Sequence, residues 1–152
     1  MQPLSRDQMA RRAAGDIPEG WCVNLGIGIP TLVANHVPPD REVIFQSENG
    51  DLANWARSEG DTAPAIGGAM DLAAGAKRLW VLMEHTSKDG RPKIVERCGY
   101  PLTGLSCVTR VYTNLAVLDL VPGRGFVVRE MAPGVGFDTL QERSAARLHL
   151  DA

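Results

Sequence analysis

Hydrophobic residues recur along the chain at two spacings, one helical and one extended. Ser5 and Gln8 form a capping box, and the apolar residues after it follow at helical spacing, which predicts an amphipathic helix over residues 5–16. Short apolar runs bounded by turn residues predict strands at 21–25, 43–45, 79–83, 108–113, 115–120 and 126–131. The continuous apolar run at 79–83 fits a buried parallel strand. Residues 92–96 are predicted to form a further short segment at a sheet edge. The last two strands are joined in hairpin fashion by a turn at 122–125.

Glycine-containing loops precede two further predicted helices. Residues 26–30 form a glycine loop with Pro30 in the first turn of a helix that extends to about residue 37, and the pair Gly67-Gly68 opens a helix of small residues. A short final helix is expected near 137–140. This order of strands and helices predicts an α/β fold with a mostly parallel central sheet and flanking helices, in one domain over residues 1–152.

Composition narrows the class of protein without naming a function. The chain has 152 residues, 44% hydrophobic and 22% charged, with a formal net charge of −2, which is ordinary for a soluble domain. It has no basic run long enough for a nucleic-acid groove and no apolar stretch long enough for a membrane span. Three cysteines without metal-ligand spacing argue against a disulfide framework or a zinc site, so we expect a cytoplasmic protein.

The strand at 43–45 leads into a candidate catalytic residue. It stops at Ser47-Glu48-Asn49-Gly50, where Asn-Gly is a strong turn signal. In an open α/β sheet, ligands bind in the crevice beyond the carboxyl ends of the strands. Glu48 there can be a nucleophile, a general base or a solvated loop acid.

The loop at Gly26 and Gly28 allows two interpretations. A strand, a glycine loop and a helix start together form an anion-binding arrangement, because backbone N–H groups and the helix dipole converge there. The glycines can equally serve only to make a tight turn. Thr31 stands where the dinucleotide fingerprint needs its third glycine, so a nicotinamide site is rejected.

His85 is the remaining candidate for acid–base chemistry. It adjoins Glu84, but adjacent residues of a strand point to opposite faces, so the two do not form a catalytic pair. A general base is one interpretation of His85, and a hydrogen-bonded structural residue is the favoured one. A Ser–His–Asp triad is excluded by the absence of a Gly-x-Ser-x-Gly elbow.

Taken in order, the motifs along nearly the whole chain resemble the B subunit of the 3-oxoacid CoA-transferases. The matching segments are NLGIGIPTLVAN at 24–35, SENG at 47–50, GDLANW at 50–55, GGAMDLA at 67–73, MEHT at 83–86, PLTG at 101–104 and LAV at 115–117. Within the family, the segments at 63–68 and 98–104 are most similar to 3-oxoadipate CoA-transferases, with the acetoacetate-using branch next.

The resemblance implies a mechanism and a partner. It implies that Glu48 attacks an acyl-CoA thioester and carries CoA as a glutamyl thioester. It also implies that the substrates are succinyl-CoA and a 3-oxoacid, and that a separate CoA-transferase A subunit completes the enzyme. No metal and no permanently bound cofactor is needed, because the coenzyme A thioester is a substrate. The residues it suggests for substrate and CoA binding are Gly26, Gly28, Asn49, Gly50, Gly67 and Gly68.

The chain departs from the family pattern at Gly50. This residue ends one motif and begins the next, whereas the family separates the two by several dozen residues that carry an active-site loop, strands and a helix. The departure keeps a second hypothesis open, a catalytically inactive remnant that retains its fold or its association with a partner chain. A sugar-phosphate isomerase of related α/β architecture is a third, weaker interpretation.

Overall fold

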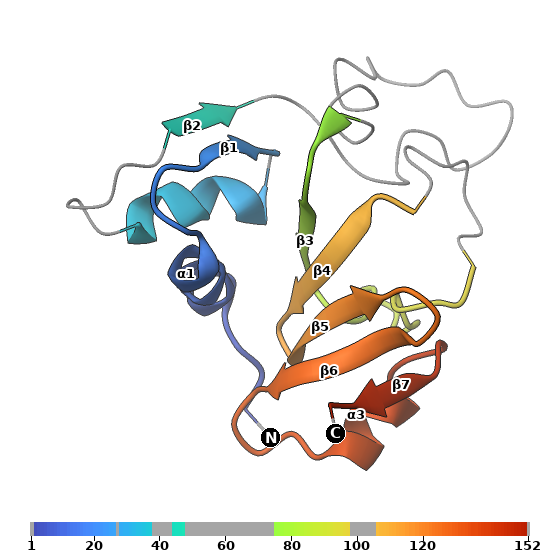
Figure 1. Ribbon diagram of the computed structural model, residues 1–152. Helices are drawn as coiled ribbons and strands as arrows, with labels where there is room; N and C mark the ends of the chain where they lie inside the picture. Colours follow the sequence, from blue (N-terminus) through green and yellow to red (C-terminus); the bar gives the residue numbers. More distant parts are fainter. Residues whose placement is uncertain (1, 27, 38–43, 48–74, 98–105, 152) are drawn as a thin grey trace, which may run out of the picture. The chain divides into compact units, whose positions relative to one another are not determined.

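The computed structural model describes residues 2–26, 28–37, 44–47, 75–97 and 106–151 (Figure 1). The chain divides into two compact units. Unit 1 contains Met1–Met9, Arg78–Arg97 and Val108–Ala152, and unit 2 contains Ala10–Lys77 and Cys98–Cys107. The prediction of a single domain over 1–152 stays a prediction.

Helix α1 (Arg6–Asp16) begins with the predicted capping box. The Ser5 N–H donates to Gln8 Oε1 at 2.8 Å, and the Gln8 N–H donates to Ser5 Oγ at 3.2 Å. These two bonds satisfy donors that the helix itself leaves without partners. The apolar positions of the helix are buried, with exposed fractions of 1% or less at Met9, Ala10, Ala13 and Ala14, so the predicted helix is confirmed.

Unit 2 contains a two-stranded parallel sheet and a 3₁₀ helix. Strand β1 (Cys22–Leu25) pairs with β2 (Ile44–Ser47), and the 3₁₀ helix η1 (Ile29–His36) lies between them in sequence. All three elements were predicted from the sequence, although the pattern did not specify a 3₁₀ rather than an α-helix.

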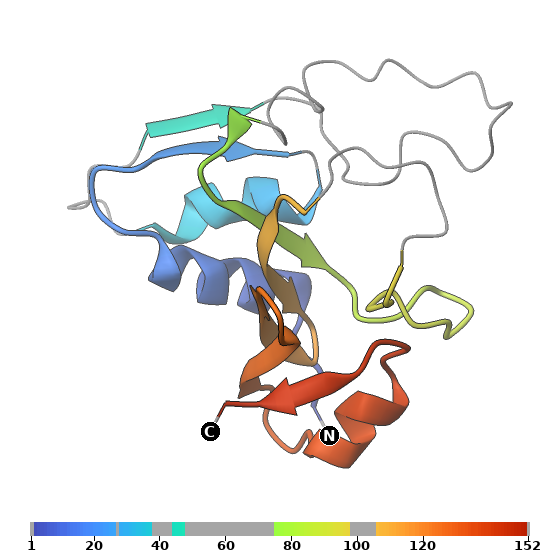
Figure 2. The same cartoon turned by 45° about the vertical axis from the view of Figure 1, so that its right-hand side comes forward.

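Unit 1 contains a five-stranded sheet in the order β3-β4-β5-β6-β7 (Figures 1 and 2). Its outer pairs, β3–β4 and β6–β7, are parallel, and the two inner pairs are antiparallel. Three of the five strand pairings in the described structure are therefore parallel, which confirms the α/β, mostly parallel prediction. The strands are β3 (Leu79–Met83), β4 (Val108–Thr113), β5 (Ala116–Val121), β6 (Gly125–Met131) and β7 (Leu148–Leu150).

Three expectations for this unit need correction. β3 is half-buried along its whole length rather than fully buried, because it is the terminal strand of the described sheet. Residues 92–96 form no strand, and Pro92 makes only an isolated bridge with Thr86. β7 was not predicted, because three residues are too few to show an alternating pattern.

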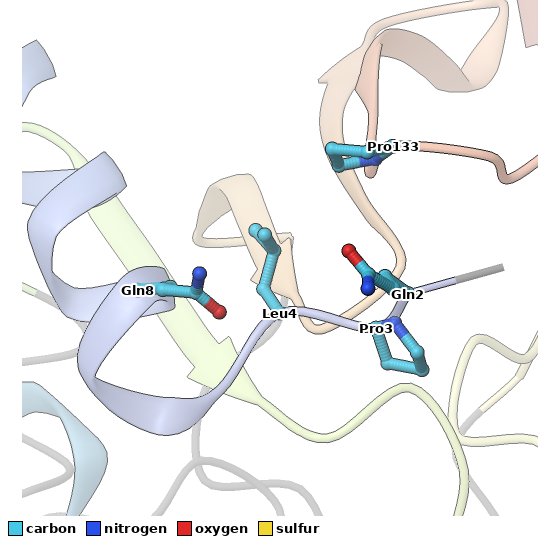
Figure 3. Close-up of a pocket in the computed structure, with 5 residues that line it drawn as sticks. All are labelled: Gln2, Pro3, Leu4, Gln8 and Pro133. Carbon is cyan, nitrogen blue, oxygen red and sulfur yellow. The ribbon is translucent and has the colours of Figure 1, made fainter.

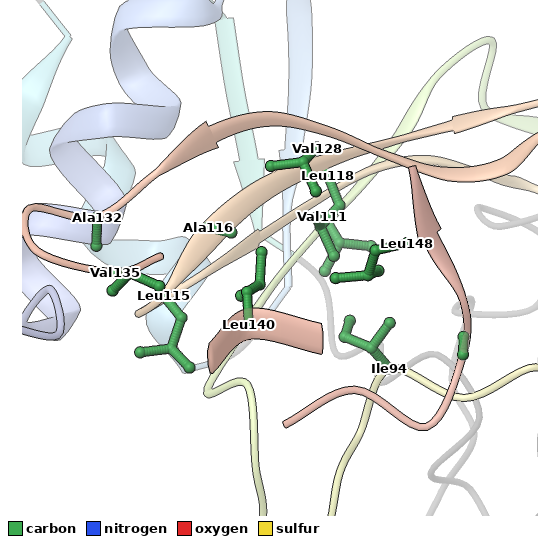
Figure 4. Packing of buried hydrophobic residues seen from close by; sticks show 11 residues of the cluster. Ile94, Val111, Leu115, Ala116, Leu118, Val128, Ala132, Val135, Leu140 and Leu148 are labelled. Carbon is green, nitrogen blue, oxygen red and sulfur yellow. The ribbon is translucent and has the colours of Figure 1, made fainter. Parts of the chain in front are cut away.

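The hydrophobic core of unit 1 lies between one face of the sheet and helix α3 (Phe137–Glu142). Figure 4 shows Leu140 of α3 pointing toward the strands that carry Val111 and Leu118. Leu118 and Leu140 are fully buried, and Ile94 joins them from the loop after β3. This packing confirms the predicted final helix and fixes it to the sheet.

Candidate functional site

The predicted catalytic region begins at the carboxyl ends of β1 and β2. The two strands run parallel in a register that pairs Cys22 with Ile44 and Leu25 with Ser47. Both strands therefore end at the same edge, where open α/β sheets bind ligands. Gly26 follows β1 at this edge and is half-buried. Ser47, the last described residue of β2, is the residue before Glu48.

Gly28 has a backbone conformation that the sequence pattern alone did not specify. Its φ is 100° and its ψ is −133°, and it caps the N-terminus of η1. This region of φ/ψ space is accessible almost only to glycine. The residue is exposed, and a Cβ added to it would meet no atom within 4 Å. The glycine is therefore required by the backbone and not by crowding.

The first turn of η1 offers fewer amide donors than the anion-binding interpretation assumed. Pro30 has no N–H, and the Thr31 N–H already donates to the Gly28 carbonyl at 3.2 Å. The Thr31 hydroxyl donates to the same carbonyl at 2.8 Å. Pairing within the turn reduces the number of donors available to an anion there.

The remaining predicted site residues lie outside the described residues. These are Glu48, Asn49, Gly50, Gly67 and Gly68. Their roles stay predictions.

His85 is held as a structural residue. It is fully buried, its Nδ1 lies 3.0 Å from Thr113 Oγ1, and its Nε2 lies 2.9 Å from Ser144 Oγ. Burial, followed by the positive charge of Arg143, lowers the pKa of His85 from 6.5 to about 4. A ring with no exposed surface and both nitrogens bonded cannot reach a substrate, so the structural interpretation is confirmed.

Glu84 and His85 bond different partners, which agrees with the prediction that they form no catalytic pair, although β3 ends at Met83 and includes neither residue. Glu84 Oε1 accepts from Arg6 Nε at 3.2 Å, and the two side chains are 36% and 66% exposed. Because the pair is open to solvent, it contributes about 1 kcal/mol or less, and many such pairs contribute nothing measurable.

A cluster around Arg110 was not predicted from the sequence. Arg110 makes a two-point ion pair with Asp119, with one contact at 3.0 Å, and its guanidinium lies 5.5 Å from the ring centroid of Trp80 and 6.0 Å from that of Tyr112. The hydrogen bond that Arg110 donates to the Asp119 carboxylate raises the pKa of Arg110. Arg129 reaches Asp119 at 3.7 Å. The sequence contained a signal for this pair: Arg110 and Asp119 are charges of opposite sign within two successive predicted strands that are otherwise largely apolar.

A pocket of about 350 Å³ opens between the N-terminal segment and the end of β6 (Figure 3). Its lining residues are Gln2, Pro3, Leu4, Gln8 and Pro133. None was a predicted site residue, and none titrates near neutral pH. The pocket therefore contains no nucleophile or general base.

The described part of the chain offers no metal site and no membrane-spanning helix. No group of three or more His, Cys, Asp and Glu side chains is placed to hold a metal ion there. In the same residues, no helix has the length and apolar character that crossing a bilayer requires.

Comparison with known proteins identifies the family. Residues 46–143 match the coenzyme A transferase family pattern, which is more than half of the chain. The B subunit of 3-oxoadipate CoA-transferase from Pseudomonas putida is 38% identical, with 95% of this chain and 96% of the relative covered. The chain belongs to the coenzyme A transferase family. A second member, the B subunit of a probable succinyl-CoA:3-ketoacid coenzyme A transferase from Bacillus subtilis, is 33% identical over 93% of this chain and 94% of its own length.

Solved structures of coenzyme A transferases share the fold. Glutaconate coenzyme A-transferase from Acidaminococcus fermentans superposes with a TM-score of 0.61 at 15% identity, covering 97% of this chain and 87% of the other. An acyl-CoA transferase from Escherichia coli O157:H7, solved as a thioester complex with CoA, gives a TM-score of 0.59 at 17% identity. This chain is covered to 99% but spans only 43% of that longer chain.

The alignment also shows that this family member is shorter than its relatives. The comparison with the Pseudomonas putida protein runs over 207 positions, whereas this chain has 152 residues. At least 55 of those positions therefore have no residue in this chain. The chain lacks residues that the relative has, as the abutting motifs predicted. That the gap follows Gly50 stays a prediction.

Proposed function

We propose that this chain is the B half of a heteromeric CoA-transferase that moves CoA from succinyl-CoA to a 3-oxoacid. We favour 3-oxoadipate as this acid, with acetoacetate as the next choice. The names of the relatives support this choice, since they include the B subunits of a 3-oxoadipate CoA-transferase and of a succinyl-CoA:3-ketoacid transferase. The designation B in those names supports a separate A chain as partner. We also place the protein in the cytoplasm, without a resident metal or cofactor.

In the proposed mechanism, Glu48 is a carboxylate nucleophile. Its oxygen attacks the thioester carbonyl of succinyl-CoA, and the CoA thiolate leaves, giving a mixed anhydride. The thiolate then attacks the glutamyl carbonyl and releases succinate, which leaves CoA bound to Glu48 as a thioester. The 3-oxoacid carboxylate repeats the sequence in reverse and departs as its CoA thioester. Covalent catalysis of this type gives ping-pong kinetics.

One observation carries the proposal: the family match begins at residue 46 and so includes the Ser-Glu-Asn-Gly motif. The local fold supports it. Because Leu25 pairs with Ser47 in a parallel register, the loop at Gly26 and the start of the motif leave the sheet at one edge. Ser47, at that edge, is the residue before Glu48 in the sequence. Because the Thr31 N–H is already paired, the donors that we propose for a developing oxyanion are the remaining backbone N–H groups of the glycine loop.

The inactive remnant is retained as a second candidate because one observation favours it. The relative aligns over 207 positions against 152 residues here. If the missing positions include pocket residues, the chain can keep its fold and its partner and still lack the chemistry.

Peptide mass spectrometry tests the proposal. The chain is mixed with succinyl-CoA and its A chain, digested, and searched for a CoA adduct on the peptide that contains Glu48. The Glu48→Gln variant should lose the adduct and all transfer activity. The Glu84→Gln variant is the matched control, because it removes an exposed glutamate whose side chain pairs with Arg6, and it should keep both.

The possible results separate the two candidates. An adduct that disappears in Glu48→Gln supports the transferase. An unmodified peptide from a protein that still co-purifies with the A chain supports the remnant. Full turnover by Glu48→Gln would overturn the assignment of the nucleophile.

A further inference from the structure

His85 lies where three segments of unit 1 meet. It follows the end of β3 after one residue, Thr113 is the last residue of β4, and Ser144 follows α3 after one residue. His85 and Thr113 are no more than 1% exposed, and Ser144 is 8% exposed. The ring is held at one nitrogen by Thr113 and at the other by Ser144. The Asn114 side chain also accepts the His85 N–H at 2.8 Å.

The hydrogen bonds of Thr113 determine which atom donates to the ring. Thr113 Oγ1 accepts the N–H groups of Leu115 at 3.1 Å and Ala116 at 2.9 Å. A hydroxyl oxygen has two lone pairs, and both are thereby used. The Thr113 hydroxyl proton remains, and it can point to His85 Nδ1 or to the Ala116 carbonyl, each at 3.0 Å.

The Ser144 side completes the assignment. Ser144 Oγ lies 2.9 Å from His85 Nε2 and 2.9 Å from the Leu140 carbonyl. A carbonyl only accepts, so the Ser144 hydroxyl donates to Leu140 when the Nε2–H donates to Ser144. In the opposite tautomer the proton is on Nδ1. Ser144 must then donate to Nε2 and give up its hydrogen bond to the Leu140 carbonyl, while Thr113 Oγ1 must accept the Nδ1–H as a third donor. The Nε2–H tautomer avoids both losses.

We propose that His85 is a neutral Nε2–H imidazole and that a proton taken up at Nδ1 opens this junction, loosening α3 and β7 from the sheet. The added N–H would point at Thr113 Oγ1, which has no lone pair left for it. Thr113 must then release a backbone N–H or move away. In the first case the turn between β4 and β5 loses a hydrogen bond from Leu115 or Ala116, and in the second case the ring loses its contact with β4.

A second set of bonds carries the disturbance to the C-terminal segment. The His85 carbonyl accepts the Lys93 N–H at 3.1 Å. The carbonyl of the next residue, Ile94, accepts the N–H groups of Ala145 at 2.9 Å and Ala146 at 3.0 Å. Displacement of His85 therefore acts on the segment after α3 through Ser144 and through the backbone at 93–94.

The charges around the ring do not favour its protonation. Arg143, next to Ser144, is the charged group that acts directly on the ring, and it lowers the pKa of His85 further after burial has done so. Glu84, the residue before His85, pairs with Arg6, and the Lys93 side chain is exposed. Thr113 and Asn114, from the β4–β5 side, carry no charge.

Nuclear magnetic resonance of the full chain tests the tautomer directly. The chain has three histidines, so the ring-nitrogen shifts of His85 at pH 7 are assigned by comparison with His36→Gln and His149→Gln variants, in both of which the His85 signals persist. We expect one ring proton, on Nε2. A proton on Nδ1, or protons on both nitrogens at pH 7, would overturn the proposal, and this measurement does not depend on a His85 variant folding.

Stability against pH tests the consequence. Because the pKa is about 4 in the folded chain and 6.5 is the ordinary value, the unfolded chain binds the proton first. Stability from this group is therefore fully present above pH 6.5 and falls as pH drops toward 4, by up to about 300-fold in the unfolding equilibrium constant. His149→Gln, the matched control in β7, should keep this loss. His85→Gln should remove it, and an unchanged acid loss in His85→Gln would refute the proposal.

Amide hydrogen exchange locates the opening. After correction for the intrinsic effect of pH, we expect the protection of α3 and β7 to fall between pH 7 and pH 4.5 more than that of β5 and β6. A uniform fall over the whole sheet would argue against a junction that releases the C-terminal segment.

Discussion

Replacing Gly28 with alanine tests whether the loop after β1 has the backbone conformation described above. At φ 100° and ψ −133°, an L-residue is strained whatever space surrounds it. The added Cβ meets no atom within 4 Å, so no steric clash contributes. We expect Gly28→Ala to lower the free energy of unfolding by about 1–3 kcal/mol, the usual cost of such a conformation.

Gly136 provides a matched control for this substitution. It is also a helix N-cap without a side-chain capping bond, and a Cβ there also meets nothing within 4 Å. Its φ of −87° and ψ of 159° are ordinary extended values. The N-cap preference for glycine over alanine and the entropy effect on the unfolded chain are common to both positions. The difference between Gly28→Ala and Gly136→Ala therefore isolates the backbone strain at Gly28.

Urea unfolding followed by circular dichroism measures both variants under one set of conditions. We expect the midpoint of Gly28→Ala to lie clearly below that of Gly136→Ala. Gly28→Asn should be as unstable as Gly28→Ala, because asparagine tolerates the left-handed helical region but not this ψ. Equal midpoints for the two alanine variants would refute the positive φ and with it the described shape of the loop.

Two further substitutions test the core and the charged cluster of unit 1. Leu140→Ala removes a fully buried side chain and should cost about 2–5 kcal/mol, whereas Leu150→Ala, at a position 53% exposed, should change the unfolding free energy by less than about 0.5 kcal/mol in the same denaturation assay. Arg110→Lys loses the two-point contact with Asp119 and the stacking on aromatic rings, so we expect thermal unfolding to show a loss of about 1–2 kcal/mol. Arg129→Lys, half exposed with one contact at 3.7 Å, should change little, and equal effects would contradict a structural role for the two-point pair.

Much of the fold followed from local patterns because local chemistry determines those elements. The capping box at Ser5 fixed the start of α1, and continuous apolar runs located β3, β4, β5 and β6 to within about one residue. β7 was missed because three residues cannot show a period. The half-burial of β3 was missed because a strand's place within the sheet depends on its neighbours and not on its own sequence.

Local sequence motifs predicted individual site residues but not which of them lie close together in the fold. Ser-Glu-Asn-Gly and the glycine loop were both recognised, but the register of Leu25 with Ser47, which brings the ends of β1 and β2 to one edge, is encoded by no local pattern. The partners of His85 lie 28 and 59 positions away in the sequence. No spacing rule connects residues at such separations, so its surroundings required the tertiary structure.

The buried core of unit 1 and the proposed nucleophile lie in different parts of the chain. The core of unit 1 is built from residues 94–148, all of which follow Gly50, and no buried side-chain nitrogen or oxygen among the described residues lacks a hydrogen bond. The proposed nucleophile instead adjoins the predicted gap. A chain that shows the His85 titration but forms no adduct at Glu48 would therefore be a folded remnant, and a chain that shows both would be a transferase that tolerates the shortening.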